Sequence, residues 1–333
     1  MQNVKRVPSL NALREHVQRN EPCIYSVPKQ MRLPFQLKWS KDFLAQSAGS
    51  TEVKVRKSTS RRFVDPAGGL WDLVQSMLLQ KASFSEFLHT GAPAGRIMSG
   101  TETYLYQNGA AAPKWRALWP DAAPLAECSG SDSENRFFDP QSLNTIGLWV
   151  SGPGVKSILH FDDSGDNNLN FQVRGSKRVT LFPPCDWPKL KTCLALGLHD
   201  MEVYKQLYEQ APHTQGPAAL SGTHPHTATL EQDDVLYIPS RWYHFVEHEG
   251  DFNINVTCWL SQNPMLSSEN TVFPLETPGR SCDDYRLLLK LICAGIVAAV
   301  LNVVARTTGL RIGDWLCAHL GSDRAFWNRD KTN

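Results

Sequence analysis

Two histidines and an aspartate have the types and spacing of a metal site. His160 and Asp162 are two residues apart in "LHFD", and His244 follows in "IPSRWYHFV". Residues i and i+2 of a strand point to the same face of a sheet, so one strand would present His160 and Asp162 together. Two histidines and one carboxylate form the facial triad of non-haem Fe(II) oxygenases, which leaves metal positions open for a co-substrate and O₂. We therefore predict that these three residues bind iron.

Each part of this pattern also has an ordinary structural interpretation. A single histidine among aromatic residues is more often a packed core residue than a ligand, and "HxD" is common by chance. The stretch "LHFDDSGDNNLNFQVRGSKRV" is also compatible with a charged hairpin of an all-β domain. Asp163 and Asp166 lie close enough in the sequence to compete as ligands, but only Asp162 keeps the i+2 relation to His160.

The segment that follows Asn144 predicts an antiparallel barrel or jelly roll. Short β-type runs separated by Gly, Pro and Asp recur there: "TIGLWVSG", "SILHFD", "LNFQVRG", "KRVTLFPP", "DDVLYIPS", "WYHFVEHEG" and "NINVTCWL". Gly175 predicts a tight turn between two of these runs. We divide the chain into residues 1–143, 144–262 and 263–333, which are N-terminal α/β elements, the barrel core and a C-terminal helical region of one integrated domain.

The N-terminal region predicts helices and strands in alternation. Residues 9–20 fit a short amphipathic helix capped by Ser9, and "WSKDFLAQS" fits another. "PCIYSV", "TEVKVRKS" and "TETYLYQNG" read as strands, the last closed by the turn Asn108-Gly109. The strongest helical pattern is "LWDLVQSMLLQKASFSEFLHT", residues 70–90.

Composition sets limits on the function. The 333 residues are 41% hydrophobic, enough for a full core, and the formal net charge of +1 gives no overall bias toward nucleic acid. The eight cysteines are scattered without a CxxC pair, and the start of the chain has no apolar run typical of a secretory signal. We interpret the cysteines as reduced core thiols of a cytoplasmic or nuclear protein.

Three motifs together resemble a known family. "HFD" with "NNLNFQVRGSKRVTLFPP", then "LEQDDVLYIPSRWYHFVEH" and "NINVTCWL", are similar to the cupin-like JmjC family of Fe(II)- and 2-oxoglutarate-dependent oxygenases. That family includes the hypoxia-inducible factor asparaginyl hydroxylase and the tRNA wybutosine-synthesis hydroxylase. The resemblance implies a mainly β fold: a double-stranded β-helix (jelly roll) with N-terminal α/β elements and C-terminal helices. It also implies the cofactors Fe(II) and 2-oxoglutarate, with O₂ as co-substrate.

The resemblance assigns a cation to the far carboxylate of 2-oxoglutarate. Lys177 in "RGSKRV" has the position of the family's lysine, and Arg178 should face the opposite side of the strand. Ser157 matches a hydroxyl residue that helps to hold the same carboxylate. Tyr104 matches a tyrosine that hydrogen-bonds it, although Tyr106 has the same parity and is an alternative.

Two further residues carry over from the family. Asn168 matches an asparagine beside the co-substrate, and its alternative role is that of a turn or bulge residue. Trp259 matches an aromatic residue near the metal, and it could equally be part of the core.

The family chemistry implies that 2-oxoglutarate is converted to succinate and CO₂ while a substrate is hydroxylated. A protein side chain is our first choice of substrate, and an RNA (tRNA) nucleoside is the second. An N-methyl-lysine demethylase and a catalytically silent cupin scaffold are further alternatives. The basic run Lys54, Arg56, Lys57, Arg61 and Arg62 could contact RNA, but we favour the solvated face of an edge strand.

The C-terminal stretch "LLLKLICAGIVAAVLNVVA", residues 287–305, is apolar and long. Lys290 and Asn302 limit its uninterrupted apolar run to Leu291 through Leu301, which is short for a membrane helix. Family members pair C-terminal helices between two subunits. We therefore expect a homodimer interface here, with membrane association as the less favoured alternative.

Overall fold

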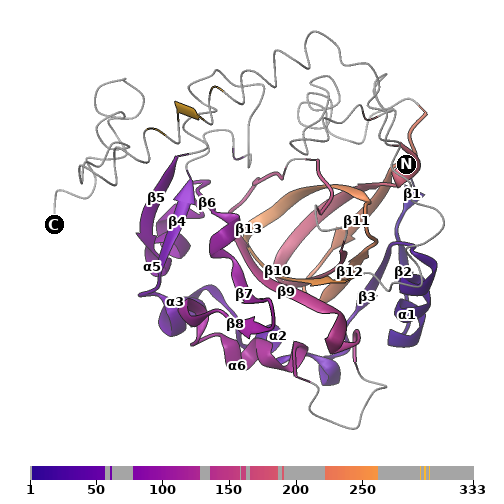
Figure 1. Cartoon of the computed structure of the whole chain (residues 1–333), viewed down its shortest axis with the longest axis horizontal. Helices are drawn as coiled ribbons and strands as arrows, with labels where there is room; N and C mark the ends of the chain where they lie inside the picture. Colours follow the sequence, from indigo (N-terminus) through magenta and orange to yellow (C-terminus); the bar gives the residue numbers. More distant parts are fainter. Residues whose placement is uncertain are drawn as a thin grey trace, which may run out of the picture.

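The main structural unit is a ten-stranded sheet. The computed structural model describes residues 2–56, 61, 78–127, 136–157, 159–162, 166–186, 190 and 222–261, together with Cys293, Ile296, Val297 and Val300. The strands of the sheet are β1 (Gln2–Asn3), β2 (Lys5–Val7), β3 (Cys23–Ser26), β7 (Tyr104–Gln107), β8 (Ala110–Ala111), β9 (Leu143–Ser151), β10 (Asn167–Phe182), β11 (His226–Leu230), β12 (Asp234–Ile238) and β13 (Tyr243–Leu260). Its curved strands enclose the centre of the molecule (Figure 1).

Two long strands, β10 and β13, each take part in two layers. The first half of β10 pairs with β12 and with the second half of β13, and β3, β9 and β7 extend this major layer. The second half of β10 pairs with β11 and with the first half of β13, which forms the minor layer. This is the jelly-roll architecture predicted from the sequence, and both layers are antiparallel at these pairings.

The change of layer takes place at Gly175. The β13 partner of β10 jumps from Ile254 opposite Arg174 to Glu249 opposite Ser176. Gly175 has a φ of 76°, and a Cβ there would lie 2.4 Å from the carbonyl oxygen of Phe252. The predicted tight turn is therefore wrong: Gly175 lies at a register shift inside one continuous strand, opposite the extra residues 250–253 of β13, because both flanking segments keep β13 as their partner.

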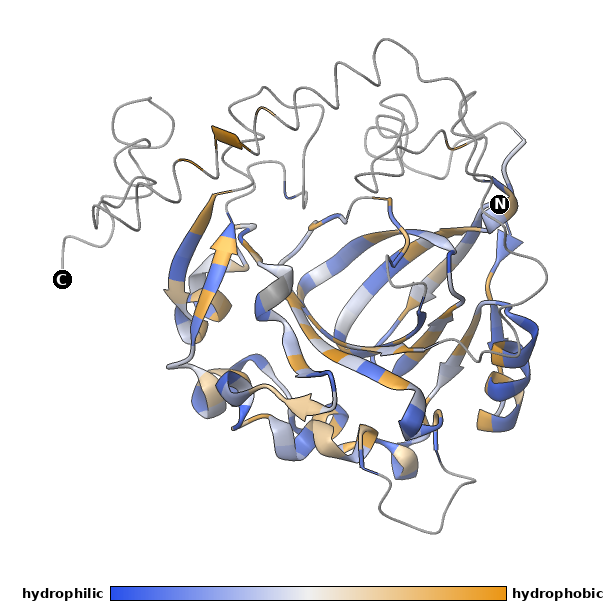
Figure 2. Cartoon of the chain, viewed as in Figure 1, coloured by the Kyte–Doolittle hydropathy of each residue, from blue (hydrophilic) through white to orange (hydrophobic). Residues whose placement is uncertain are grey.

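The alternation of residues along these strands creates two cores. The outer face of the major layer packs against the N-terminal helices through residues such as Phe171, Val256 and Trp39. The inner faces of the two layers meet in a smaller apolar cluster that includes Leu181, Leu236 and neighbours. Hydrophilic and hydrophobic residues alternate along the long strands (Figure 2). The polar residues that face inward are therefore enclosed between the layers.

The N-terminal helices largely follow their capping signals. Helix α1 (Leu10–Arg19) begins after Ser9, whose hydroxyl accepts a hydrogen bond from the Ala12 amide at 3.2 Å. Helices α2 (Pro34–Lys38) and α3 (Lys41–Ala48) follow, and α3 has the corresponding cap at Ser40. Further along, α6 (Trp119–Ala122) lies near the hairpin β7–β8, which turns at Asn108 and Gly109 as predicted.

A separate three-stranded sheet contradicts part of the predicted helix over residues 70–90. Its order is β5 (Leu79–Ser83), β4 (Glu52–Arg56), β6 (Ile97–Met98), and only α5 (Phe84–Glu86) and the π-helical turn Phe87–Gly91 are helical. Strand β5 forms because its backbone pairs along the whole of β4. This tertiary contact cannot be seen in the spacing of apolar residues, which favoured a helix. Residues 70–77 of that prediction lie outside the described residues.

The same sheet corrects the interpretation of the basic run. Strand β4 is central and not at an edge. Lys54 lies 3.7 Å from the Glu102 carboxylate, and the Arg61 guanidinium donates to the backbone carbonyls of Pro153 and Pro93. Burial lowers the pKa of Arg56. The described members of the run therefore serve internal contacts, while Lys57 and Arg62 lie outside the described residues.

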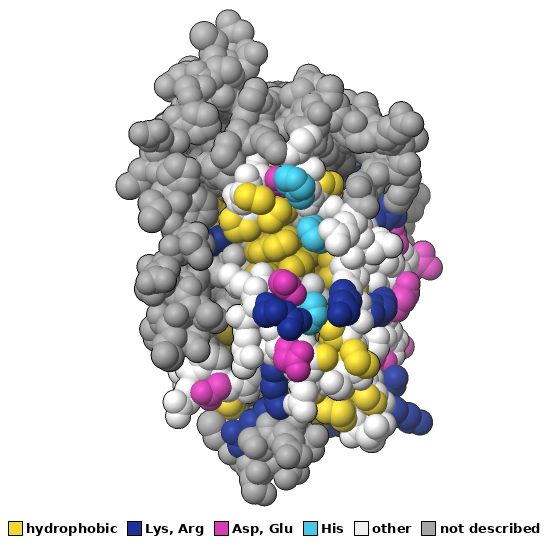
Figure 3. All heavy atoms as spheres, turned by 90° about the vertical axis from the view of Figure 1, so that its right-hand side faces the viewer, with side chains coloured by type: hydrophobic (Ala, Val, Ile, Leu, Met, Phe, Trp, Pro, Cys, Tyr) yellow, Lys and Arg dark blue, Asp and Glu magenta, His cyan; other side chains and the backbone are white. Residues whose placement is uncertain are grey.

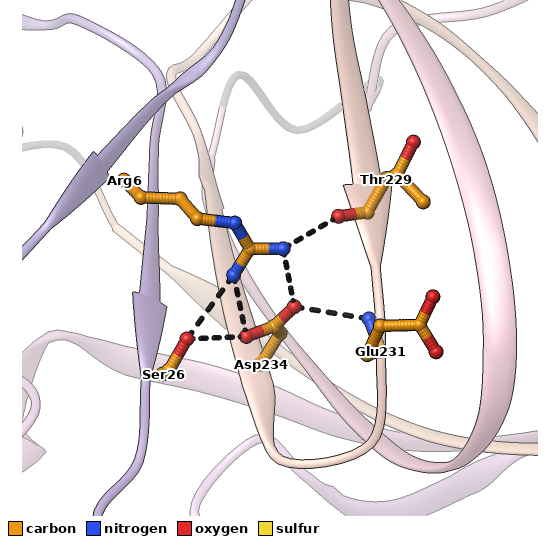
Figure 4. Close-up of polar contacts among 5 residues, drawn as sticks. All are labelled: Arg6, Ser26, Thr229, Glu231 and Asp234. Carbon is orange, nitrogen blue, oxygen red and sulfur yellow. Dashed lines mark hydrogen bonds and ion pairs between the residues drawn. The ribbon is translucent and has the colours of Figure 1, made fainter.

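One ionic cluster joins the N-terminal strands to the barrel (Figure 4). Both oxygens of Asp234 accept hydrogen bonds from Arg6, at 2.8 and 2.9 Å, and the carboxylate also accepts from Ser26 and from the Glu231 amide. Arg6 donates in addition to the carbonyl of Thr229. The cluster thus links β2 and β3 to the connection between β11 and β12.

The described cysteines are free thiols. Cys23 and Cys258 are buried, as expected, whereas Cys185 and Cys293 are exposed, so the core interpretation is wrong for these two. Apart from Cys293, Ile296, Val297 and Val300, the predicted interface over 287–305 lies outside the described residues. Within the part of the chain that the structure describes, no helix is long and apolar enough to span a membrane.

Candidate metal centre

The fold brings His160 and His244 together through their backbones. The two residues form an isolated antiparallel bridge in which each amide donates to the other's carbonyl, at 3.1 and 2.7 Å. Their ring centroids are 4.2 Å apart. Directly opposed residues of an antiparallel pair have side chains on the same face, so the bridge itself places both imidazoles side by side.

Asp162 completes the group. One ligand atom from each of His160, Asp162 and His244 lies within 4.8 Å of the others, and Asp162 Oδ1 is 4.0 Å from His244 Nε2. The second carboxylate oxygen of Asp162 accepts a hydrogen bond from Asn168 Nδ2 at 2.9 Å. Asp166 accepts from Asn144 and does not belong to this group, while Asp163 lies outside the described residues.

The protonation of His244 suits a metal ligand. Its Nδ1 is 3.1 Å from the carbonyl of Trp242, and because a carbonyl only accepts, Nδ1 carries the proton and Nε2 keeps its lone pair. Burial, and then the neighbouring His160, lower the pKa of His244, so the ring is neutral. Metal–nitrogen and metal–oxygen bonds are roughly 2.0–2.2 Å long, so one ion could span the 4.0 Å between His244 Nε2 and Asp162. The donors therefore fit a divalent ion.

Lys177 is the buried cation of the site. It is 2% exposed and points inward from the minor layer, whereas Arg178 points outward and pairs with Glu249. Burial lowers the pKa of Lys177 to about 7. Its ammonium donates to the neutral Asn170 side chain, and no carboxylate of the described residues lies within ion-pair distance. Such a site favours an incoming anion, because an unpaired charge is costly to bury.

Three polar residues beside Lys177 were not identified from the sequence. Asn170 Nδ2 donates to Thr257 at 3.0 Å, Thr257 donates to Asn255 at 3.2 Å, and Asn255 donates back to Asn170. Because Asn170 comes from the major layer, its bond to Lys177 joins the two layers. The alternation in "NLNFQV" and "NINVTCW" was the available signal, but it is also the pattern of a solvent-facing strand.

The two candidate tyrosines point in different directions. A register shift between Tyr104 and Tyr106 breaks the parity on which their equivalence depended. Tyr106 stacks on Trp119, with ring centroids 5.4 Å apart, and packs against the outer core. Tyr104 contacts Trp259 at 6.4 Å between centroids. Tyr104 is therefore the tyrosine on the side of the predicted site residues.

Asn168, Trp259 and Ser157 also lie near the triad. Trp259 is paired with Asn168 across the β10–β13 register, and Asn168 in turn contacts Asp162. The Oδ1 atom of Asn168 is buried without a hydrogen-bond partner in the described structure. Ser157 is 8% exposed, and its hydroxyl oxygen accepts from the Val246 amide at 2.8 Å.

A second group of potential metal ligands lies where β10 ends and β11 begins. Cys185, Asp186 and His224 also have ligand atoms within 4.8 Å of one another. Asp186 is fully buried, and its two oxygens contact the His224 amide at 2.6 Å and the His224 ring at 2.8 Å. These hydrogen bonds explain why the three residues lie together: they connect the end of β10 to the start of β11.

Similarity to known proteins agrees with this architecture. A family model described as "Cupin-like domain" matches residues 9–265. JmjC domain-containing protein A of Dictyostelium discoideum is 25% identical over 249 residues, which are 73% of this chain and 89% of that protein. The match therefore extends over both the N-terminal elements and the barrel.

Two other relatives are similar over shorter stretches. HSPB1-associated protein 1 of Homo sapiens is 30% identical over 113 residues, 34% of this chain and 23% of that protein. The tRNA wybutosine-synthesizing protein 4 of Neurospora crassa is 35% identical over 131 residues, 37% of this chain and 10% of that protein. The matched region thus spans a quarter or less of either relative. On the family match over residues 9–265, this chain belongs to the cupin-like, JmjC-type domain family, whose members are generally oxygenases.

Proposed function

We propose that this protein is an Fe(II)- and 2-oxoglutarate-dependent dioxygenase that hydroxylates a protein side chain. The observation that carries the proposal is the pairing of a His160–Asp162–His244 ligand group with the buried Lys177, which has no carboxylate partner among the described residues. A metal-binding scaffold would need the ligand group but not the buried cation. A 2-oxo dicarboxylate uses both, because one end can bind the metal while the other end needs a cation.

Different residues of this chain bind the metal, bind the co-substrate and position a metal ligand. His160, Asp162 and His244 would hold the iron, which when bound supplies the activation of O₂. Lys177 binds the far carboxylate and so fixes the orientation of 2-oxoglutarate. Asn168 holds Asp162 by its side-chain amide at 2.9 Å, which fixes the carboxylate without using its other oxygen.

Two observations bear on the substrate. The described residues of the basic run make internal contacts, which removes one reason to expect RNA. On the face drawn in Figure 3, Lys and Arg side chains are interspersed with Asp and Glu. The similarity to tRNA wybutosine-synthesizing protein 4 keeps an RNA nucleoside as the second candidate.

The first test is the release of succinate from 2-oxoglutarate by the full chain with Fe(II). We expect His160→Ala to lower the rate at least 100-fold, because two ligands bind iron weakly. His89→Ala is the matched control, since His89 is exposed and outside the site. If wild type and His160→Ala released succinate equally, or neither did with any protein or RNA pool, the scaffold alternative would be favoured.

The second test separates the substrates. Proteins and RNA from cells with the active protein and with His160→Ala are compared by mass spectrometry for a +16 Da modification. We expect a difference in a protein side chain. A difference confined to RNA would support the nucleoside hydroxylase, and loss of methyl groups from lysine would support the demethylase.

A further inference from the structure

Three side chains with metal-ligand chemistry lie together outside the metal centre. Cys185 and Asp186 end the short helical turn that follows β10, and His224 lies two residues before β11 begins. One ligand atom from each of the three lies within 4.8 Å of the others. None of them belongs to the triad, so a function of this group would be additional to the proposed one.

Asp186 fixes the orientation of the His224 ring. Its carboxylate is completely buried, and Oδ1 is 2.8 Å from Nδ1 of His224, whose side chain is 64% exposed. Because a carboxylate accepts, Nδ1 donates, and in the neutral ring Nε2 keeps its lone pair. A second hydrogen bond, from the His224 amide to Oδ2 at 2.6 Å, holds the backbone of this residue. Histidines that bind metals are typically oriented by a carboxylate in this way.

Cys185 places a free thiol beside this ring. The residue is exposed, although cysteine is among the residue types that are most often buried. The turn that carries it is closed by its own backbone, because the Asp186 amide donates to the carbonyl of Pro183 at 2.9 Å. The thiol and the imidazole are therefore both accessible to an ion from solvent, and the sequence-distant residues that carry them are held in place by hydrogen bonds.

The contact between Asp186 and His224 does not by itself require a cysteine. A carboxylate and an imidazole would connect the two strand ends with any residue at position 185. The thiol adds a different chemistry, because thiolate sulfur and imidazole nitrogen are donors that Zn(II) prefers in proteins. We propose that Cys185 and His224 bind Zn(II), with Asp186 as the positioning residue for the His224 ring. Binding releases the thiol proton to solvent, and water completes the coordination.

The donor atoms distinguish this site from the metal centre. The triad offers nitrogen and oxygen only, whereas Cys185 offers sulfur. Co(II) replaces Zn(II) as a spectroscopic probe, and a cobalt–thiolate bond gives an intense near-ultraviolet charge-transfer band that nitrogen and oxygen donors do not give. The band therefore reports binding at Cys185 even when the metal centre is also occupied.

The test is a titration of the full, reduced chain with Co(II), followed by displacement of Co(II) with Zn(II). We expect the thiolate band in wild type and in His160→Ala, and its loss in Cys185→Ser. Asp186→Asn should weaken Zn(II) binding about 10–100-fold, because the ring of a ligand loses the carboxylate that orients it. His224→Ala removes a ligand and should weaken binding at least as much.

Cys293→Ser and His89→Ala are the matched controls, because both residues are exposed and lie outside the ligand group. Near-ultraviolet circular dichroism of the metal-free variants checks that each is folded. A wild type without the thiolate band would overturn the inference, as would a band that survives in Cys185→Ser. Because the band does not depend on His160 and succinate release is measured separately, failure of this proposal is distinguishable from failure of the oxygenase proposal.

Discussion

At the scale of single residues, Lys177 is a basic side chain enclosed between the two layers of the barrel. It is almost fully buried, its hydrogen-bond acceptor is an amide, and burial lowers its pKa to about 7. A carboxylate next to it would raise that pKa, so the complex holds the proton more tightly than the free protein. Binding of an anion at neutral pH is therefore coupled to protonation of Lys177.

The sign of this coupling gives a prediction. Above pH 7 the free protein has lost the Lys177 proton and must take one up on binding, so affinity for 2-oxoglutarate falls as pH rises. Between pH 6.5 and 8.5 we expect a decrease on the order of tenfold, measured by isothermal titration calorimetry. Lys177→Arg is the control: its guanidinium stays protonated, so its affinity should be nearly independent of pH. A flat wild-type profile would contradict the coupling.

At the scale of elements, the register shift at Gly175 separates the two layers that β10 and β13 share. Its left-handed φ and the nearby Phe252 carbonyl leave no room for a side chain. Lys177 lies just beyond this change of register and points inward with Val179 and Leu181, the alternate residues of the same strand.

Gly175→Ala should therefore be costly. We expect it to lower the free energy of unfolding by roughly 2–4 kcal/mol, from the φ penalty together with the 2.4 Å contact. Gly109→Ala is the matched control, since Gly109 has a φ of 81° but no atom within 4 Å of the added Cβ. It should cost only about 1 kcal/mol in urea denaturation. Similar losses for both variants would show that the close contact has no effect.

The elements also show what the sequence could predict and what it could not. Local signals were sufficient where the cause is local, as in the caps at Ser9 and Ser40 and the turn at Asn108. They failed for β5, whose partner is a strand far away in sequence, and for Gly175, where a turn and a bulge have the same residue preference. Both errors concern the pairing of β-strands, which a short stretch of sequence does not reveal.

In the candidate site, too, the features with a local cause could be predicted and those that depend on strand pairing could not. His160, Asp162 and His244 could be predicted because a facial triad needs particular residue types at particular spacings. Asn170, Asn255 and Thr257 were missed because an alternating strand does not reveal whether its polar face meets water or another layer. Tyr104 and Tyr106 could not be told apart, since the shift that separates them is a property of the β7–β9 pairing.

At the scale of the whole molecule, the N-terminal strands belong to the same sheet as the barrel. Strand β3 pairs with β12, β2 pairs with β3, and the Asp234 cluster fixes this edge. The Asp234 side chain is only 4% exposed, whereas Arg6 is 49% exposed. Losing Arg6 would leave a largely buried carboxylate without its cation.

Arg6→Met should consequently destabilise the protein by about 1–3 kcal/mol, because the Asp234 carboxylate loses two charge-assisted hydrogen bonds. The measurement is thermal unfolding combined with hydrogen exchange, and the first amides to lose protection should be those of β3 and β12. Arg19→Met is the control, since the carboxylates that Arg19 pairs with among the described residues, Glu15 and Glu21, are exposed. An equal effect of both substitutions would contradict the role given to the Asp234 cluster.

The backbone bridge between His160 and His244 has a consequence for metal supply. Two of the ligands are already held side by side by main-chain hydrogen bonds, so the fold, and not the ion, assembles the site. A preassembled set of nitrogen and oxygen donors follows the general affinity order of divalent metals, in which Cu²⁺ and Ni²⁺ bind more tightly than Fe²⁺. Whether iron occupies the site would then depend on which metals the protein encounters. Replacement of iron by a tighter-binding ion would abolish the activity without unfolding the protein.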